Sequence, residues 1–144
     1  MSHKILLIDD DGDDREFFLD AISKVSADVS CTILESCVDL IPDLIAGTLE
    51  RPHLIFLDIN MPEMSGWTCM SLLKEHAALN DIPVIMYSTS THIEEAMRAK
   101  EVGAVSFFTK PCDFKTLREI LKEVIDHLDQ NTLAKLTTNS GRFY

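Results

Sequence analysis

Carboxylate side chains cluster directly after the first hydrophobic run of this sequence. Asp9, Asp10 and Asp11 follow the aliphatic residues 5–8, and seven of the 24 acidic residues lie between positions 9 and 20. Two carboxylates about 4 Å apart repel each other by roughly 4 kcal/mol at an effective dielectric constant of about 20. Such a cluster must therefore hold a proton, bind a cation or lie beside a fixed positive charge.

Polar side chains also follow three later hydrophobic runs. Asp58 and Ser88 come directly after two of them, and Lys110 comes shortly after a third. Ligands of open parallel sheets bind beyond the carboxyl ends of the strands, so we expect these groups to meet the aspartates at one edge. A few carboxylates, without His or Cys but with room for water and phosphate, suit Mg²⁺ better than Ca²⁺. Asp58 can then accept a phosphoryl group as an acyl phosphate, while Lys110 and Ser88 hold the phosphoryl oxygens.

The hydrophobic runs themselves predict a parallel sheet. Four runs are short and largely non-alternating, as in strands buried on both faces, and they cover residues 5–8, 54–57, 84–87 and 105–108. A weaker run at residues 29–34 alternates, which suits an edge strand. Segments with the apolar spacing of a helix follow each run. This order predicts an α/β fold, a doubly wound five-stranded parallel sheet with helices on both faces.

Helix-start signals agree with this order. Asp13 and Thr91 each precede a Glu by three residues, which predicts capping boxes for the first and fourth helices, and Asp113 is the predicted cap of the fifth. The predicted second helix, residues 38–46, contains Pro42, which a helix accepts only in its first turn.

Charge and composition restrict the partners. A formal net charge of −11 argues against direct binding of nucleic acid or anionic membranes, because Lys and Arg must replace the counterions there. The first hydrophobic run is too short for a secretory signal or a membrane span, so we expect a cytoplasmic protein. The four cysteines form no C-x-x-C pair and are expected to be reduced structural thiols.

The length of 144 residues fits one domain with one complete core. We assign residues 1–128 to this domain. Residues 129–144 are polar, lack a periodic apolar pattern and are expected to form a tail rather than a separate output domain.

Four sequence motifs together resemble those of the receiver domain of two-component response regulators. The motifs read LLIDD, LIFLDINMP, IPVIMYSTS and FFTKP, and the resemblance extends over roughly residues 4–128. Each motif alone is weak, but the four in this order at strand ends are specific. The resemblance implies a flavodoxin-like fold with the strand order 2-1-3-4-5.

The resemblance also implies a role for each matching residue. Asp58 is the implied phosphoacceptor. Asp10 is an implied ligand of Mg²⁺, Asp9 acts on the metal directly or through water, Asp58 binds it as well, and Asn60 supplies its backbone carbonyl.

Four further positions match the phosphate-binding and switching residues of the family. Ser88 takes the place of the switch hydroxyl, and Lys110 takes that of the phosphate-contacting lysine, before an implied cis-proline at Pro111. Phe107 occupies the aromatic switch position. Since it lacks the hydroxyl of a tyrosine, its inward and outward rotamers differ only in packing.

The implied function is that of a stand-alone response regulator. It accepts a phosphoryl group from a phosphohistidine of a sensor histidine kinase or a histidine phosphotransfer protein and signals to a downstream effector protein. A homodimer through the fourth helix, fifth strand and fifth helix is a further implied partnership. Catalysis is limited to the protein's own phosphorylation and dephosphorylation. None of the five histidines shows a metal-binding or nucleophile-activating pattern, so we expect the donor histidine on another protein.

Two alternative functions compete with this interpretation. A haloacid-dehalogenase-type phosphatase also forms an aspartyl phosphate with Mg²⁺, but it needs a second aspartate two residues after Asp58, where this chain has Asn60. A degenerate receiver that only docks partners would leave phosphorylation unused, although every residue needed for the chemistry is present.

A calcium loop is a third interpretation of the acidic segment. Asp9, Asp11 and Asp13 form the pattern D-x-D-x-D, yet such a loop needs Gly at its sixth position and Glu at its twelfth. This register offers Asp14 and Asp20 there, so we reject the calcium loop. We expect Asp11 to lie on the surface without touching a metal.

Overall fold

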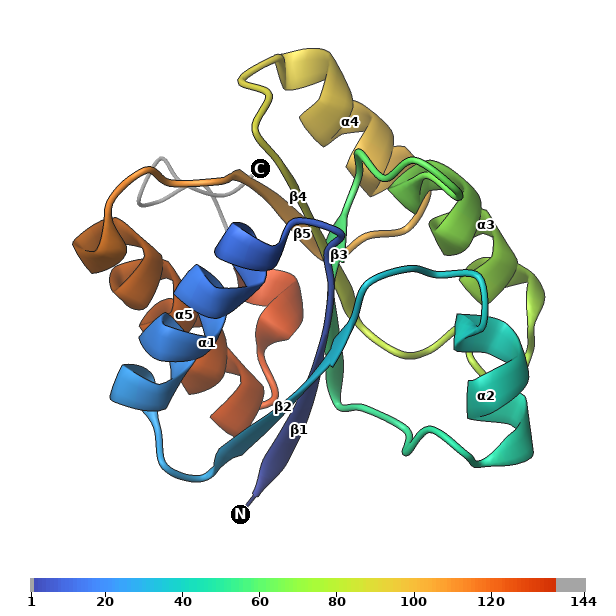
Figure 1. Ribbon diagram of the computed structural model, residues 1–144, viewed down its shortest axis with the longest axis horizontal. Coiled ribbons are helices and arrows are strands. Elements are labelled where there is room, and N and C mark those ends of the chain that lie inside the picture. The colour runs from blue at the N-terminus through green and yellow to red at the C-terminus, as the bar shows by residue number, and fades with distance from the viewer. Residues whose placement is uncertain (1, 137–144) are drawn as a thin grey trace.

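The computed structural model describes residues 2–136, along which strands and helices alternate (Figure 1). The strands are β1 (His3–Ile8), β2 (Val29–Leu34), β3 (Leu54–Asp58), β4 (Val84–Ser88) and β5 (Ser106–Thr109). The helices are α1 (Gly12–Val25), α2 (Leu40–Ala46), α3 (Gly66–Glu75), α4 (Ile93–Glu101) and α5 (Phe114–Asp129), followed by a 3-10 turn, η1 (Leu133–Lys135). All five predicted strands and all five predicted helices are therefore confirmed.

The strands form one parallel sheet in the order β2-β1-β3-β4-β5, which confirms the predicted order. Figure 1 shows α1 and α5 on one face of the sheet and α2, α3 and α4 on the other. The chain leaves β1 toward one face and β3 toward the opposite face. Their connections therefore separate above the sheet and open a crevice between them, where ligands of such folds bind.

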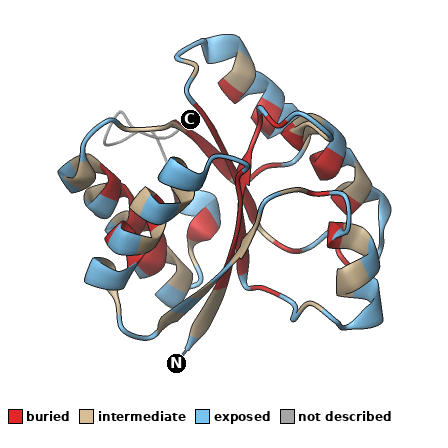
Figure 2. Cartoon of the chain, viewed as in Figure 1, coloured by how far each residue is buried: buried red, intermediate tan, exposed pale blue. Residues whose placement is uncertain are grey.

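Two hydrophobic layers sandwich the sheet. Alternate residues of the central strands face the α1–α5 layer, for example Leu7 and Phe56, or the opposite layer, for example Leu6 and Leu57. All of β3 is buried, as the red strand in Figure 2 shows. Burial on both faces explains why the runs in the sequence are continuous rather than alternating.

The structure corrects two of the three predicted helix caps. Asp113 does cap α5, since its carboxylate accepts a hydrogen bond from the backbone N–H of Thr116 at 2.8 Å. Asp13 is not the cap of α1, because Asp11 accepts from two first-turn amides and starts the helix two residues earlier. Thr91 is not the cap of α4, which begins after His92 without a side-chain cap. Pro42 lies in the first turn of α2, as predicted.

The segment predicted as a tail begins as part of the fold. Helix α5 extends to Asp129, and the η1 turn follows it. Leu133 and Leu136 are both buried in the α1–α5 layer. Polar residues directly precede Leu133 and directly follow Leu136, so the sequence pattern alone did not reveal the burial of these leucines. The rest of the predicted tail, 137–144, lies outside the described residues.

The cysteines divide into two groups. Cys37 and Cys69 are buried in the layer that holds α2, α3 and α4, and hydrogen bonding between the two thiols raises the pKa of Cys69. Burial also raises the pKa of Cys31 to about 12. Cys112 is exposed, so the predicted structural role is wrong for this cysteine. Within residues 2–136, no helix combines the length and apolar character needed to cross a membrane.

Gly66 fixes the distance between the start of α3 and the end of β3. A Cβ at this position would lie 2.5 Å from the carbonyl oxygen of Asp58 and 2.8 Å from Cα of Ile59. The Gly66 amide also donates to the carbonyl oxygen of Ile59 at 2.8 Å. Both obstructing atoms belong to the backbone, so no side-chain rotation can make room.

We therefore expect Gly66→Ala to lower the free energy of unfolding by about 1–3 kcal/mol through overpacking. Gly12→Ala is the matched control, because its Cβ would meet only the Arg15 guanidinium at 3.5 Å and the helix gains a better helix former. Urea denaturation followed by circular dichroism measures both values. Equal stability of the two variants would show that α3 can move away from Asp58 at no cost.

Candidate functional site

Four strands deliver polar groups to one edge of the sheet. The site contains Asp9 and Asp10 after β1, Asp58 at the end of β3, Ser88 at the end of β4 and Lys110 after β5. A cavity of about 390 Å³ opens there and is lined by Asp10, Asp11, Asp14, Asp58, Asn60, Thr89 and Lys110. The convergence of carboxylates and an ammonium group, expected from the sequence, is present in the structure.

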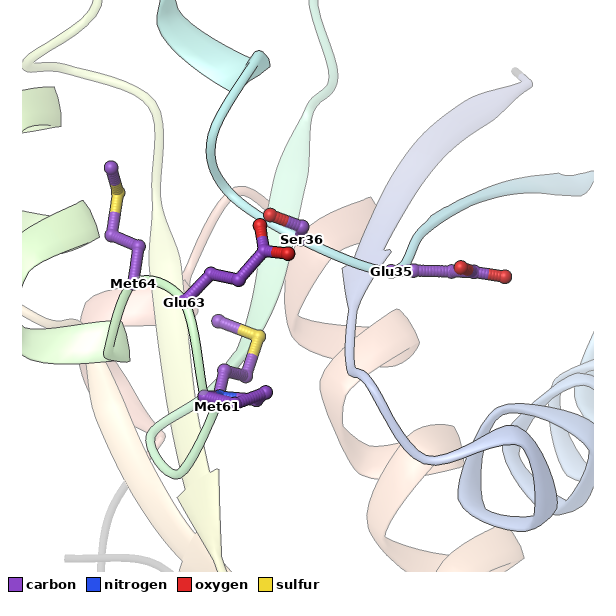
Figure 3. Close-up of a pocket in the computed structure, with 6 residues that line it drawn as sticks. Glu35, Ser36, Met61, Glu63 and Met64 are labelled. Atoms are coloured by element: carbon purple, nitrogen blue, oxygen red, sulfur yellow. The ribbon is translucent and has the colours of Figure 1, made fainter.

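A smaller hollow of about 130 Å³ lies beside this edge, between the segment after β2 and the loop after β3 (Figure 3). Its described lining residues are Glu35, Ser36, Met61, Pro62, Glu63 and Met64, with no Lys or Arg among them. Figure 3 shows the Glu63 carboxylate directed toward Ser36. Without a positive group this hollow is unsuited to a phosphate, so the larger cavity is the candidate site.

Three carboxylates form a compact oxygen cluster. Asp9, Asp10 and Asp58 each offer one oxygen, and these atoms lie within 4.8 Å of one another. Opposite ligands of an octahedral Mg²⁺ are about 4.2 Å apart, since each Mg–O bond is about 2.1 Å. Asp9 and Asp58 are buried whereas Asp10 is exposed, so the cluster has a solvent side that leaves room for water ligands. The donor set therefore fits a small, hard divalent cation.

The ammonium group of Lys110 lies among these acids. Its Nζ is 3.0 Å from Asp9 Oδ2, 2.9 Å from Asp14 Oδ2 and 3.5 Å from Asp58 Oδ1. Burial disfavours the charged amine, but its hydrogen bond to Asp14 and the Asp58 charge outweigh that cost and raise the pKa of Lys110. Lys110 is thus a charged group that offsets the repulsion within the cluster.

The surroundings of Asp58 perturb its carboxyl group. Burial is the largest cause and raises the pKa of Asp58 to about 7, aided by the nearby charge of Asp9 and opposed by Lys110. Its carboxylate accepts a hydrogen bond from the backbone N–H of Asn60 at 3.3 Å. A group of this kind exchanges a proton for a bound cation near neutral pH.

Ser88 and Phe107 occupy protected positions behind the cavity. Ser88 is fully buried, and its Oγ accepts hydrogen bonds from Asn60 Nδ2 at 3.3 Å and from the Ser90 amide at 3.1 Å. Phe107 is buried in the layer of α2, α3 and α4. Thr89, which had no predicted role, lines the cavity where Ser88 does not.

The predicted cis-proline is wrong, because the peptide bond between Lys110 and Pro111 is trans. Trans is the lower-energy form of an X–Pro bond by about 0.5–1 kcal/mol. In this conformation the Lys110 amide donates to the Ser88 carbonyl at 2.7 Å, and the side chain still reaches the acids. The placement of Lys110 therefore does not need a cis bond.

Two further residues of the site, Asp14 and Tyr87, were missed by sequence reasoning. Asp14 binds Lys110 from the first turn of α1, where a helical register beginning at Gly12 directs it toward the site. Tyr87 donates its hydroxyl hydrogen bond to Asp9 Oδ2 at 2.6 Å, and the Lys110 ammonium lies 4.8 Å from its ring centroid. A phenol within a buried strand needs a partner, and this was the available sequence signal.

The other acidic residues of the segment serve the helix rather than a metal. Asp11 is exposed, as predicted, and its carboxylate accepts from the Asp13 and Asp14 amides at 2.9 and 3.1 Å. Asp13 itself lies exposed in the first turn of α1. The segment is therefore a capped helix start, which agrees with the rejection of the calcium loop.

The raised pKa of Asp58 predicts a pH-dependent stability. The folded protein holds this proton up to about pH 7, whereas an unfolded Asp loses it near its ordinary pKa of 3.8, so folding binds a proton between these limits. Stability contributed by Asp58 is complete below the unfolded pKa and is lost as the pH rises to about 7 and above.

Between pH 5 and 8, in the presence of a chelator, we expect the free energy of unfolding of the wild type to fall by about 2–3 kcal/mol relative to that of Asp58→Asn. Urea denaturation of both proteins measures this difference, and parallel pH profiles would contradict it.

Comparison with known proteins agrees with the sequence motifs. A family model described as Response regulator receiver domain matches residues 5–122. "Probable transcriptional regulator ycf27" of Porphyridium aerugineum is 30% identical over 139 residues, covering 96% of this chain and 54% of that protein. "Protein PilG" of Pseudomonas aeruginosa is 29% identical over 119 residues, covering 83% of this chain and 84% of that one. The chain thus spans about half the length of the ycf27 relatives.

A solved structure shares the fold. It is described as "Crystal Structure of the Phosphorylated Cyanobacterial Phytochrome Response Regulator RcpA" and matches with a TM-score of 0.81 at 21% identity, over 91% of this chain and 96% of that one. This likeness concerns the fold alone, whereas the family model covers most of the sequence. The protein therefore belongs to the response regulator receiver domain family, the phosphorylatable modules of two-component signalling.

Proposed function

We propose that this protein accepts a phosphoryl group on Asp58 from a phosphohistidine of a sensor histidine kinase or histidine phosphotransfer protein, with Mg²⁺, and then signals through protein contacts. The observation that carries the proposal is the position of Asp58. Its buried carboxylate shares an oxygen cluster with Asp9 and Asp10 and lies 3.5 Å from the Lys110 ammonium. Phosphoryl transfer needs this combination of positioning and charge neutralisation.

Asp9, Asp10, Asp58 and the backbone carbonyl of Asn60 are the proposed holders of Mg²⁺. When bound, the cation supplies positive charge that reduces repulsion between the carboxylates and an incoming phosphoryl group. Asp10 lies at the solvent side of the cluster, where water can complete the coordination shell. The Asn60 amide donates to Asp58 Oδ1, which helps to orient the acceptor carboxylate.

In the proposed transfer an oxygen of ionised Asp58 attacks the phosphorus of phosphohistidine. The new O–P bond forms as the P–N bond breaks, so the imidazole nitrogen takes the bonding electron pair and a proton from solvent, and Asp58 becomes an acyl phosphate. Lys110 lines the same cavity as Asp58 and is proposed to exchange Asp9 and Asp14 for the phosphoryl oxygens. The reaction consumes the protein's own side chain, so no turnover of an external substrate is proposed.

The signal is proposed to arise from a new hydrogen bond that the Ser88 hydroxyl donates to the phosphoryl group. The phosphoryl group adds about −1.5 to −2 charges and three acceptor oxygens. It can draw the Ser88 hydroxyl away from Asn60, to which it is bonded at 3.3 Å, and so displace the β4–α4 connection. Phe107, buried in the layer of α2, α3 and α4, would adjust by packing alone. Such a change is a shift between two conformations of one fold.

The face of α4, β5 and α5 is the proposed contact surface for an effector or a second copy. On α4, Ile93 is 50% exposed and Met97 is 58% exposed, four residues apart on one side of the helix. Arg98 on α4 lies 4.2 Å from the ring centroid of Trp67, which follows the first residue of α3. This cation–π contact ties α4 to the element that packs on Asp58.

The protein is proposed to act as a stand-alone response regulator in the cytoplasm. A net charge of −11 disfavours direct binding to nucleic acid or anionic membranes. Buried thiols such as Cys37 and Cys69 agree with a reducing compartment. Since the ycf27 relatives are about twice as long, the stand-alone state is part of the proposal.

Phosphorylation is tested with acetyl phosphate and Mg²⁺, followed by intact mass measurement. We expect one labile phosphate on the wild type and none on Asp58→Asn. Asp20→Asn, which changes an exposed carboxylate of α1 outside the cavity, is the matched control and should retain the phosphate. Steady hydrolysis of unrelated phosphoesters would favour the phosphatase alternative, and absence of both activities would favour the docking module.

Lys110 should affect the switch more than the metal. We expect Lys110→Ala to bind Mg²⁺ at least as tightly as wild type. The substitution removes the ammonium group that competes with Mg²⁺ for the carboxylates. The phosphorylated variant should lose most of the change in Trp67 fluorescence, since no cation holds the phosphoryl group in place; the single tryptophan makes this signal unambiguous. Titration of Mg²⁺ and fluorescence before and after acetyl phosphate measure the two effects. A full fluorescence response in the variant would remove Lys110 from the switch.

A further inference from the structure

Tyr87 contacts the acidic cluster from a distant strand. Its residue lies on β4, whereas Asp9 follows β1, and β3 separates these strands in the sheet. The phenol ring crosses this gap on the α1–α5 side, and its hydroxyl donates to Asp9 Oδ2 at 2.6 Å. Both residues are buried, so the contact is shielded from solvent. A hydrogen bond to a buried carboxylate is among the stronger ones in proteins.

Three donors surround the Asp9 carboxylate. Oδ1 accepts from the Asp11 backbone N–H at 3.0 Å, while Oδ2 accepts from both Tyr87 at 2.6 Å and the Lys110 ammonium at 3.0 Å. Of these donors, the lysine is shared with two other carboxylates, Asp14 and Asp58. Lys110 is therefore the donor with alternative partners, and Tyr87 is a donor with Asp9 as its acceptor.

The two side chains also differ in how firmly they are held. The Tyr87 ring is stacked on Phe108, with centroids 5.4 Å apart and planes 18° apart, and it belongs to the buried layer beneath α1 and α5. Lys110 reaches the cluster on a flexible four-carbon chain. The rigid ring of Tyr87 is therefore better suited than Lys110 to keep a hydrogen bond to Asp9 while the lysine moves.

We propose that Tyr87 is a positioning residue for the metal: its hydroxyl would keep the Asp9 carboxylate oriented toward the Mg²⁺ site once the cation has displaced Lys110. The inference rests on the proposed function, because it assumes that Mg²⁺ binds at this site and replaces the Lys110 ammonium beside Asp9. Without Tyr87, the buried Asp9 carboxylate would keep only one hydrogen-bond donor after losing the ammonium. That donor is the Asp11 amide, which binds the other oxygen, Oδ1. Hydrogen bonds to ligating carboxylates orient them and support metal affinity.

Tyr87→Phe isolates this role, because it keeps the ring and its stack on Phe108 and removes one oxygen. We expect the Kd for Mg²⁺, measured by calorimetry without any phosphodonor, to rise about 10-fold. The Mg²⁺ concentration that gives half-maximal phosphorylation by acetyl phosphate should rise by a similar factor, while the rate at saturating Mg²⁺ stays near that of wild type. This split between affinity and maximal rate is not expected from a general loss of packing.

Thr109→Val is the matched control. It removes a hydroxyl from the same end of the sheet, where Thr109 Oγ1 donates to the Ser90 carbonyl at 2.9 Å rather than to a carboxylate. We expect its Kd for Mg²⁺ to stay within a factor of two of the wild-type value. Thermal unfolding without metal records how much stability each variant loses.

An unchanged or lower Kd in Tyr87→Phe would overturn the role of Tyr87, including when the variant has lost stability. Because calorimetry needs no phosphoryl transfer, this result leaves the proposed function untouched. If wild type binds Mg²⁺ but never takes up phosphate, the proposed function fails while the Kd comparison still decides the role of Tyr87. A wild type that binds no Mg²⁺ would overturn both.

Discussion

The site depends on a concentration of negative charge that water does not fully screen. Asp9 and Asp58 are buried beside the exposed Asp10, and the Lys110 ammonium among them offsets their repulsion. The compensation is incomplete, because burial still raises the pKa of Asp58 to about 7. A site of this kind favours the binding of a divalent cation, and the proposed phosphoryl transfer would use that cation together with Lys110.

The sheet makes this charge concentration possible by holding its members rigidly. Parallel strands bring their carboxyl ends to one edge, and β3 lies buried between two hydrophobic layers, so Asp58 cannot withdraw from its neighbours. Gly66 lets the start of α3 pack directly on the Asp58 backbone. The Asp11 cap starts α1 at Gly12, and this register directs Asp14 to Lys110. Packing and capping therefore determine the electrostatics of the site.

The contacts that stabilise the cluster are the ones that signalling would exchange. Lys110 divides its hydrogen bonds among three acids, and Ser88 is bonded to Asn60. Both groups have new acceptors once a phosphoryl group is present, whereas the Tyr87 ring and the Asp11 amide stay with Asp9. In the proposed switch, the movable donors Lys110 and Ser88 would serve the phosphoryl group, and the fixed donors would keep serving Asp9. This separation allows a change of shape without loss of the metal site.

The sequence by itself determined the order of strands and helices, because runs buried on both faces are continuously hydrophobic, and it indicated Asp9, Asp10, Asp58, Ser88 and Lys110, because they directly follow those runs. The α1 start, the trans bond before Pro111 and the burial of Leu136 were decided by local geometry and packing that no spacing encodes. Only the tertiary structure decided that Tyr87 serves Asp9. That contact crosses an intervening strand, and its two residues are separated by 78 positions, so it exists only once the sheet has assembled.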